Sequence, residues 1–148
     1  MSGARITIDF DLQGEDEIQA ALGAVVRQGN NLTDVFADFG EHLLISHRER
    51  WDRQEAPDGT PWVPLSPKYQ ARKPKNQDQI LVLEGYMRDQ LTYQVSPNSL
   101  QFGSNKIQAA SHQFGDSDRG IPAREHLGMT DNDKTMLLEI ASEHLLDL

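Results

Sequence analysis

Residues 32–53, LTDVFADFGEHLLISHRERWDR, form the longest periodic segment of the chain. Apolar side chains recur in this segment at the spacing of an α-helix, at Leu32, Val35, Phe36, Phe39, Leu43, Leu44 and Trp51. Thr33 is the candidate N-cap, and Gly40 marks a point of close packing. The segment therefore predicts the central helix of the fold.

The chain ahead of this helix predicts one strand and one further helix. Residues 5–12 alternate strictly between apolar and polar side chains, which is the period of a half-buried strand. Residues 14–27 carry apolar side chains three and four positions apart, and three acidic residues stand in the first turn, where the helix dipole favours them. A strand followed by two helices is expected over residues 5–53.

A hairpin is predicted in the second half of the chain. Two alternating runs, residues 91–95 and 100–102, are joined by the turn residues Pro97 and Asn98. Residues 80–90, which precede the hairpin, are expected to form a short helix or turn.

Two helices are predicted after the hairpin. Residues 107–114 favour a short helix, and residues 131–146 carry the apolar stripe of a closing helix. Thr130 and Asp133 resemble a capping box in front of that closing helix. The predicted fold class is α+β, with a small antiparallel sheet packed against two or three helices and long loops between the elements.

Two long stretches, residues 54–78 and 115–128, have no period. Prolines interrupt the first stretch, and glycine and aspartate are frequent in the second. Ser66 and Pro67 are expected to begin one short helix that reaches Arg72. Because loops of this length in a small domain are usually functional or disordered, both stretches are expected to become ordered on a partner.

Length and composition limit the class of protein. With 148 residues, of which 37% are hydrophobic and 25% charged, the chain fits one ordinary domain, residues 1–148, with one core. No apolar run approaches the roughly 18 residues that cross a bilayer, so no membrane partner is expected. The amino terminus lacks a secretory signal pattern, which predicts a protein made for the cytoplasm. The chain has no cysteine, which excludes disulfides, thiol nucleophiles and thiolate metal sites.

The formal net charge of −9 is unevenly distributed. Residues 1–40 hold 2 basic and 7 acidic side chains, whereas residues 41–75 hold 7 basic and 5 acidic ones. Since sequence-independent DNA binding needs a basic surface, this chain would mostly repel DNA. Four basic side chains form a basic loop, at Lys68, Arg72, Lys73 and Lys75. The basic loop is either a solvated surface or a contact with an acidic neighbouring subunit or with nucleic acid.

The histidines do not predict a catalytic or metal site. His42 and His47 are five residues apart and so do not share a helix face, and His47 lies on the apolar stripe as a core or interface residue. His112 and His126 flank an acidic loop and leave open one alternative, a metal-dependent hydrolase or accessory protein that processes DNA. The sequence contains no phosphate-binding loop, nucleophile elbow or dinucleotide motif. A protein without enzymatic activity or cofactor is expected.

Several short blocks occur in a fixed order over residues 45–145. They are Trp51, residues 58–66 (DGTPWVPLS) with Tyr69, Leu81 and Leu83 before Gly85, residues 103–105 (GSN), residues 112–115 (HQFG), residues 121–124 (IPAR), and Leu127 with Gly128. In this order and spacing the chain resembles the phage virion morphogenesis family, the tail completion proteins of Mu-like and related tailed phages. It departs from the family pattern at Glu84, Met87, Gln108 and His126, the last of which stands where Phe is common.

The resemblance implies a structural virion protein that acts in phage tail completion and head–tail joining. It implies a ring, expected to contain six copies, at the head-proximal end of the tail. The implied partners are further copies of the chain, the tail tube and head–tail connector proteins, and DNA that passes through the channel without tight binding. The implied location is the tail or neck of the virion, after assembly in the host cytoplasm. A net negative ring would hold passing DNA off its wall.

In such a ring, residues 54–78 and 115–128 are expected to act as assembly arms. Large side chains outside the periodic core are common interface anchors, and the candidates are Trp62, Leu65, Tyr69 and Phe114. Packing in the core is the alternative for Trp62. Arg124 is expected to bind a carboxylate of its own or a neighbouring subunit with both arms of its guanidinium group, and a surface arginine is the alternative.

Overall fold

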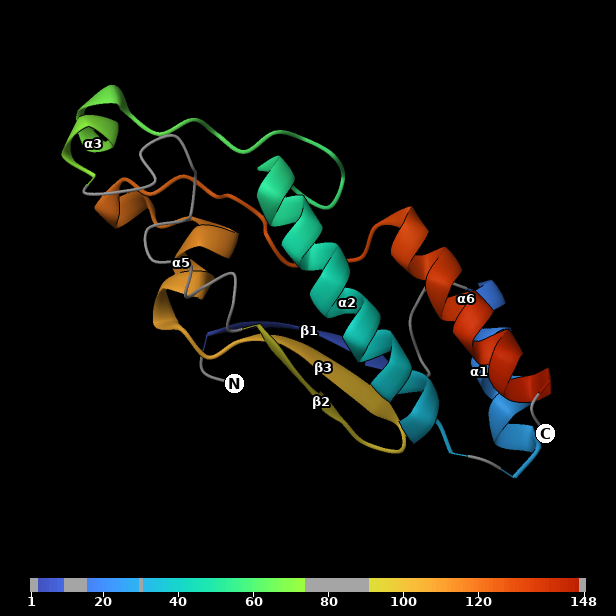
Figure 1. Cartoon of the computed structure of the whole chain (residues 1–148). Coiled ribbons are helices and arrows are strands. Elements are labelled where there is room, and N and C mark those ends of the chain that lie inside the picture. The colour runs from blue at the N-terminus through green and yellow to red at the C-terminus, as the bar shows by residue number, and fades with distance from the viewer. Residues whose placement is uncertain (1–2, 10–15, 30, 74–90, 147–148) are drawn as a thin grey trace. The chain divides into compact units, whose positions relative to one another are not determined.

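The computed structural model describes residues 3–9, 16–29, 31–73 and 91–146 (Figure 1). The predictions for residues 80–90 and for Lys75 of the basic loop fall outside these described residues.

The described elements confirm an α+β fold with a small antiparallel sheet. In chain order they are β1 (Ala4–Asp9), α1 (Asp16–Arg27), α2 (Thr33–Arg53), α3 (Pro67–Arg72), β2 (Thr92–Val95), β3 (Ser99–Ser104), α5 (Ile107–Phe114), the short 3-10 helix η1 (Ser117–Arg119) and α6 (Asp131–Leu146). The strand order is β1-β3-β2, so the second strand of the hairpin lies in the middle of the sheet. The predicted central helix, hairpin and closing helix are each confirmed.

The chain divides into two compact units, and neither is a continuous stretch of sequence. Unit 1 comprises Met1–Arg5, His47–Thr92 and Gly103–Gly128. Unit 2 comprises Ile6–Ser46, Tyr93–Phe102 and Met129–Leu148. The expected single domain with two assembly arms stays a prediction.

The core of unit 2 is formed by the apolar stripes of its helices and by the hairpin. Its buried side chains include Ile18, Leu22 and Val25 of α1, Val35, Phe36, Phe39 and Leu43 of α2, Leu100 and Phe102 of β3, and Leu137, Ile140 and Ala141 of α6. Helices α1 and α6 lie side by side (Figure 1). Each large apolar side chain buried in this way contributes about 1.5–3 kcal/mol, which makes the helical stripes the main source of stability in this unit.

Gly40 lets the hairpin approach α2 closely. A Cβ atom built on Gly40 would lie 2.6 Å from Cδ2 of Tyr93, so no larger residue fits there without a shift of the ring. The Tyr93 hydroxyl donates a hydrogen bond of 2.7 Å to Oε1 of Glu41, and this bond raises the pKa of Tyr93. The close packing predicted at Gly40 is confirmed.

Side-chain caps begin three of the helices. The predicted cap of α3 is confirmed, since Ser66 Oγ accepts a hydrogen bond from the Tyr69 backbone N–H at 3.2 Å. The prediction of Thr33 as the N-cap of α2 is wrong, because the capping side chain lies two residues earlier. Thr33 is the first helical residue, and its N–H donates to Oδ1 of Asn31 at 2.9 Å, because an asparagine side chain readily bonds the backbone two residues on. The third cap is that of α6, which Thr130 provides.

Candidate functional site

The last turn of α2 leads into a closed turn that belongs to unit 1. Glu55 and Pro61 form an isolated antiparallel bridge across it. At its tip, Oδ1 of Asp58 accepts a hydrogen bond of 2.9 Å from the Thr60 backbone N–H, and this bond lowers the pKa of Asp58. The turn brings Trp62 back to the end of α2.

Trp62 packs in an aromatic cluster with Trp51 and His126. Its ring meets Trp51 edge-on at a centroid distance of 5.4 Å, and the His126 ring meets Trp51 at 5.1 Å. Trp62 is only 5% exposed, and its Nε1 donates to the Glu125 carbonyl oxygen at 2.8 Å. Of the two interpretations of Trp62, core packing is therefore the one that its position in unit 1 supports.

Arg124 forms the predicted two-armed contact, but its acceptors differ from those expected. Nε donates to the carbonyl oxygen of Val63 at 2.8 Å, and Nη2 donates to that of Pro64 at 3.2 Å. The side chain is 7% exposed, and burial lowers its pKa. Within the chain the acceptors are thus two backbone carbonyl groups and not a carboxylate, because the carbonyl groups of an irregular segment need partners and a guanidinium fork offers matching donors. A contact of Arg124 with a carboxylate of a neighbouring subunit stays a prediction.

Gln113 of α5 holds the neighbouring segment in place, a role that is not among the predictions from the sequence. Its Oε1 accepts hydrogen bonds of 2.9 Å from the backbone N–H groups of both His126 and Leu127. Its Nε2 donates to the Leu127 carbonyl oxygen at 3.1 Å. One amide side chain therefore replaces the regular pairing that a strand would give these residues. The only available signal was the position of Gln113 inside the HQFG block of the resemblance.

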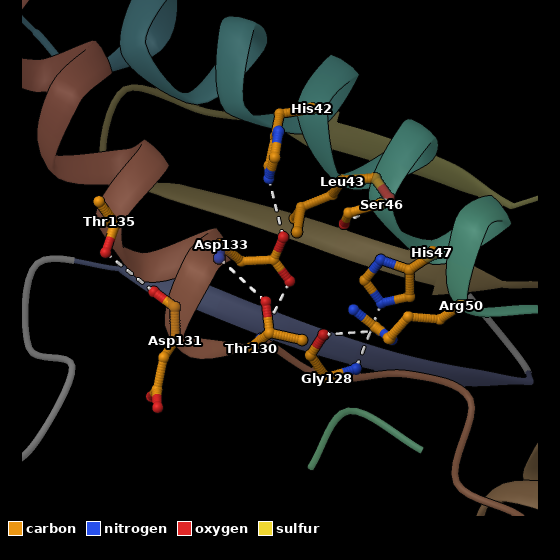
Figure 2. Close-up of polar contacts among 10 residues, drawn as sticks. All are labelled: His42, Leu43, Ser46, His47, Arg50, Gly128, Thr130, Asp131, Asp133 and Thr135. Atoms are coloured by element: carbon orange, nitrogen blue, oxygen red, sulfur yellow. Dashed lines mark hydrogen bonds and ion pairs between the residues drawn. The ribbon is translucent and has the colours of Figure 1, made fainter. Parts of the chain in front are cut away.

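The same segment is anchored to the end of α2 at Gly128 (Figure 2). His47 Nε2 accepts from the Gly128 backbone N–H at 3.2 Å, and Arg50 Nη2 donates to the Gly128 carbonyl oxygen at 2.9 Å. His47 is fully buried and Arg50 is 2% exposed. The interpretation of His47 as a core residue is confirmed.

In unit 2, an imidazole–carboxylate pair is built into the start of α6 (Figure 2). The capping box is confirmed, since Thr130 Oγ1 accepts from the Asp133 N–H at 3.0 Å and Asp133 Oδ2 accepts from the Thr130 N–H at 2.9 Å. The other carboxylate oxygen of Asp133 lies 2.8 Å from Nε2 of His42. Asp133 is fully buried, so these contacts replace the water that its carboxylate loses. The arrangement caps a helix.

The alternative of a hydrolytic site gains no support from the positions of His112 and His126. Burial lowers the pKa of His126 to about 4, and burial followed by the charges of Arg124 and Arg119 lowers that of His112. His126 is 2% exposed and so lies out of reach of a substrate. Among the described residues, no group of three His, Asp or Glu side chains is placed to hold a metal ion.

The remaining predicted anchor residues are spread between the surface and the interior. Phe114 is 73% exposed and Tyr69 is 42% exposed, whereas Leu65 is half-buried.

In the basic loop, Lys73 is only 4% exposed and so does not fit the alternative of a solvated surface, whereas Arg72 is exposed. Val63 is 48% exposed and was not among the candidates. In the described part of the chain, no helix combines the length and apolar character needed to cross a bilayer.

Comparison with known proteins gives two matches. The model of the phage virion morphogenesis family matches residues 14–146. Tail completion protein S of Escherichia phage P2 is 31% identical over 121 residues, which cover 74% of this chain and 81% of that protein. No solved structure matches the chain. Because the family model matches nearly the whole length of this chain, the chain belongs to the phage virion morphogenesis family.

Proposed function

We propose that the chain is a structural virion subunit that completes the phage tail at its head-proximal end and takes part in head–tail joining. The observation that carries this proposal is the family match over residues 14–146, together with a relative named as a tail completion protein. The chain acts as a ring, for which we propose six copies. Its partners are neighbouring copies, the tail tube and the head–tail connector. It is located in the tail or neck after assembly in the host cytoplasm.

The construction of unit 1 supports a role in assembly. Arg124 and Gln113 fix two irregular segments through hydrogen bonds to their backbone groups. Next to these bonds, Tyr69 and Phe114 keep large exposed side chains. Loops that are fixed before binding lose less conformational entropy when they meet a partner, so this arrangement suits a contact surface.

The net charge supports a channel through which DNA passes freely. A chain of net charge −9 gives a ring of six copies a strongly negative field. Such a field repels the phosphate backbone, and repulsion prevents DNA from binding tightly to the wall. A ring that lines its channel with the basic residues of residues 68–75 would contradict this part of the proposal.

Genetic complementation tests the function. Phage lacking this gene are grown with and without the wild-type chain supplied from a plasmid, and the lysates are examined by negative-stain electron microscopy. The proposal predicts separate heads and tails without the chain, and joined infectious particles with it. Normal virions in the absence of the chain would contradict the proposal.

A further inference from the structure

Unit 1 exposes three large apolar side chains that nothing in the described residues covers. Val63, Tyr69 and Phe114, here called the aromatic patch, are 48%, 42% and 73% exposed. Arg124 connects the segments of Val63 and Phe114: its Nε donates to the Val63 carbonyl oxygen, and its backbone N–H donates at 2.6 Å to the carbonyl oxygen of His112, two residues before Phe114. Tyr69 lies on α3, which begins four residues after Val63. Exposed apolar side chains on segments that are tied together in this way are candidates for a contact surface.

Unit 2 has an acidic face on α2, which is complementary in charge to unit 1. Asp34, Asp38, Glu41 and Ile45 are all exposed and follow one another at spacings of four, three and four residues, which places them along one side of the helix. We call this side the acidic face. Ile45 at its end is 61% exposed, more than any other large aliphatic side chain in the described residues. Three carboxylates thus lead to one exposed apolar side chain.

The charges of the two units favour contact between unlike units. Unit 1 contains 12 basic and 10 acidic residues, a net charge of +2, whereas unit 2 contains 2 basic and 13 acidic residues, a net charge of −11. The exposed Arg72 lies three residues after Tyr69 on α3, beside the aromatic patch. Two acidic faces repel each other, which disfavours contact between them. The aromatic patch lies beside a basic residue and therefore attracts an acidic face.

We propose that the aromatic patch of one copy docks on the acidic face of the next copy. Ile45 inserts beside Tyr69 and Phe114, and Glu41 lies opposite Arg72. Such a contact uses two different surfaces of the chain, and so it is a head-to-tail interface, the kind that closes into a ring when the rotation per subunit fits. The inference deepens the proposed function and rests on it for the ring.

Two variants with a mixing step test this interface in the full-length chain. Phe114→Ser damages the patch, and Ile45→Asp damages the face; Val26→Asp, at an apolar position of α1 that is 44% exposed, is the matched control. Sedimentation velocity at low salt is expected to show association for the wild-type chain and for Val26→Asp. For Phe114→Ser and for Ile45→Asp, the dissociation constant of self-association is expected to be about tenfold or more above that of the wild-type chain.

The mixture gives the sharpest outcome. Phe114→Ser keeps an intact face and Ile45→Asp keeps an intact patch, so an equimolar mixture is expected to form 1:1 dimers and nothing larger. Monomers in the mixture, or a wild-type chain that stays monomeric at its solubility limit, would overturn the inference. If Phe114→Ser lowers the unfolding temperature without changing association, the patch is covered by the chain itself and the inference is wrong. Should Phe114→Ser fail to fold, Tyr69→Ser replaces it.

Complementation separates this inference from the proposed function. If the wild-type chain restores joined particles and both variants restore them equally well, the docking surfaces are wrong and the function stands. If phage lacking the gene make normal virions, the proposed function is wrong.

Discussion

Arg124 donates a hydrogen bond of 2.8 Å to the carbonyl oxygen of Val63, which lies 61 residues earlier in the chain. This bond joins the IPAR block, residues 121–124, to the block at residues 58–66. Two of the blocks that carry the family resemblance are thus the donor and acceptor sides of one contact. The contact recognises backbone carbonyl groups, so it fixes the path of the loop rather than the identity of its side chains.

Replacing Arg124 by lysine should destabilise unit 1. Lysine cannot donate two bonds in a planar fork, so one of the two charge-assisted hydrogen bonds of this buried side chain is lost, at a cost of about 1–3 kcal/mol in the free energy of unfolding. Urea denaturation measures the change. Arg119→Lys is the control, because the Arg119 side chain is 64% exposed and its substitution should change stability by less than about 0.5 kcal/mol. Equal effects of the two substitutions would show that the fork has no structural role.

Gln113→Leu should lower the stability of the chain more than a comparable substitution on the same helix. The substitution leaves two backbone N–H groups of residues 126–127 without their acceptor, each worth about 1–3 kcal/mol if it stays buried. Gln108→Leu, at an exposed position of α5, is the matched control and should be nearly neutral. Thermal unfolding of both variants makes the comparison. A Gln113→Leu chain as stable as the control would mean that water replaces the amide.

The stability of the chain should fall in mild acid partly because of His126. Its pKa is about 4 in the folded chain and 6.5 in the unfolded one, so between these values the unfolded state binds more protons. The contribution is complete above about pH 6.5 and is lost as the pH falls toward 4, by up to about 3 kcal/mol.

His126→Phe isolates this contribution, since a phenyl ring fills the same aromatic cluster without titrating. In urea denaturation at several pH values, the free energy of unfolding of the variant should rise relative to that of the wild-type chain as the pH falls from 7 to 4. A constant difference between the two proteins over this range would contradict the buried neutral imidazole.

Gly40→Ala should destabilise unit 2 although alanine is the better helix former. The new methyl group meets the Tyr93 ring, and overpacking of this kind costs about 1–3 kcal/mol, more than the roughly 1 kcal/mol gained in helix propensity. In a Tyr93→Ala background the obstacle is gone, and the same substitution should be neutral or stabilising. A double-mutant cycle measured by urea denaturation gives the coupling. Additive effects would rule out the contact as the cause.

Thr130→Ala should cost about 1 kcal/mol, because the Asp133 N–H loses its cap at the start of α6. Thr135→Ala on the exposed side of the same helix is the control, since alanine favours the helix there. Unfolding monitored by circular dichroism at 222 nm distinguishes the two. A smaller loss for Thr130→Ala than for Thr135→Ala would contradict the capping box.

The regular elements could be predicted because their periods reflect burial. The stripe of residues 32–53 and the alternating runs of residues 91–95 and 100–102 each follow one face of an element, and the structure has α2, β2 and β3 there. The cap of α2 was misplaced because Asn31 and Thr33 are both good capping residues, and the sequence does not say which side chain reaches the N–H.

The irregular segments could not be predicted, because their order comes from contacts between residues far apart in the sequence. Nothing local at Arg124 indicates that two carbonyl groups about 60 residues away accept its bonds. Likewise, Gln113 resembles any polar helical residue until its acceptor oxygen is seen between two N–H groups. The charge of Lys73 leaves open a solvated position or a contact, and its burial depends on how the loop folds.

Co-sedimentation of the purified chain with tails isolated from phage that lack its gene tests the proposed role in tail completion. The chain is expected to bind these tails at a fixed copy number, close to six per tail, and the bound tails are then expected to join heads in vitro. If the chain stays in the supernatant when tails are present and leaves their ability to join heads unchanged, it does not complete tails.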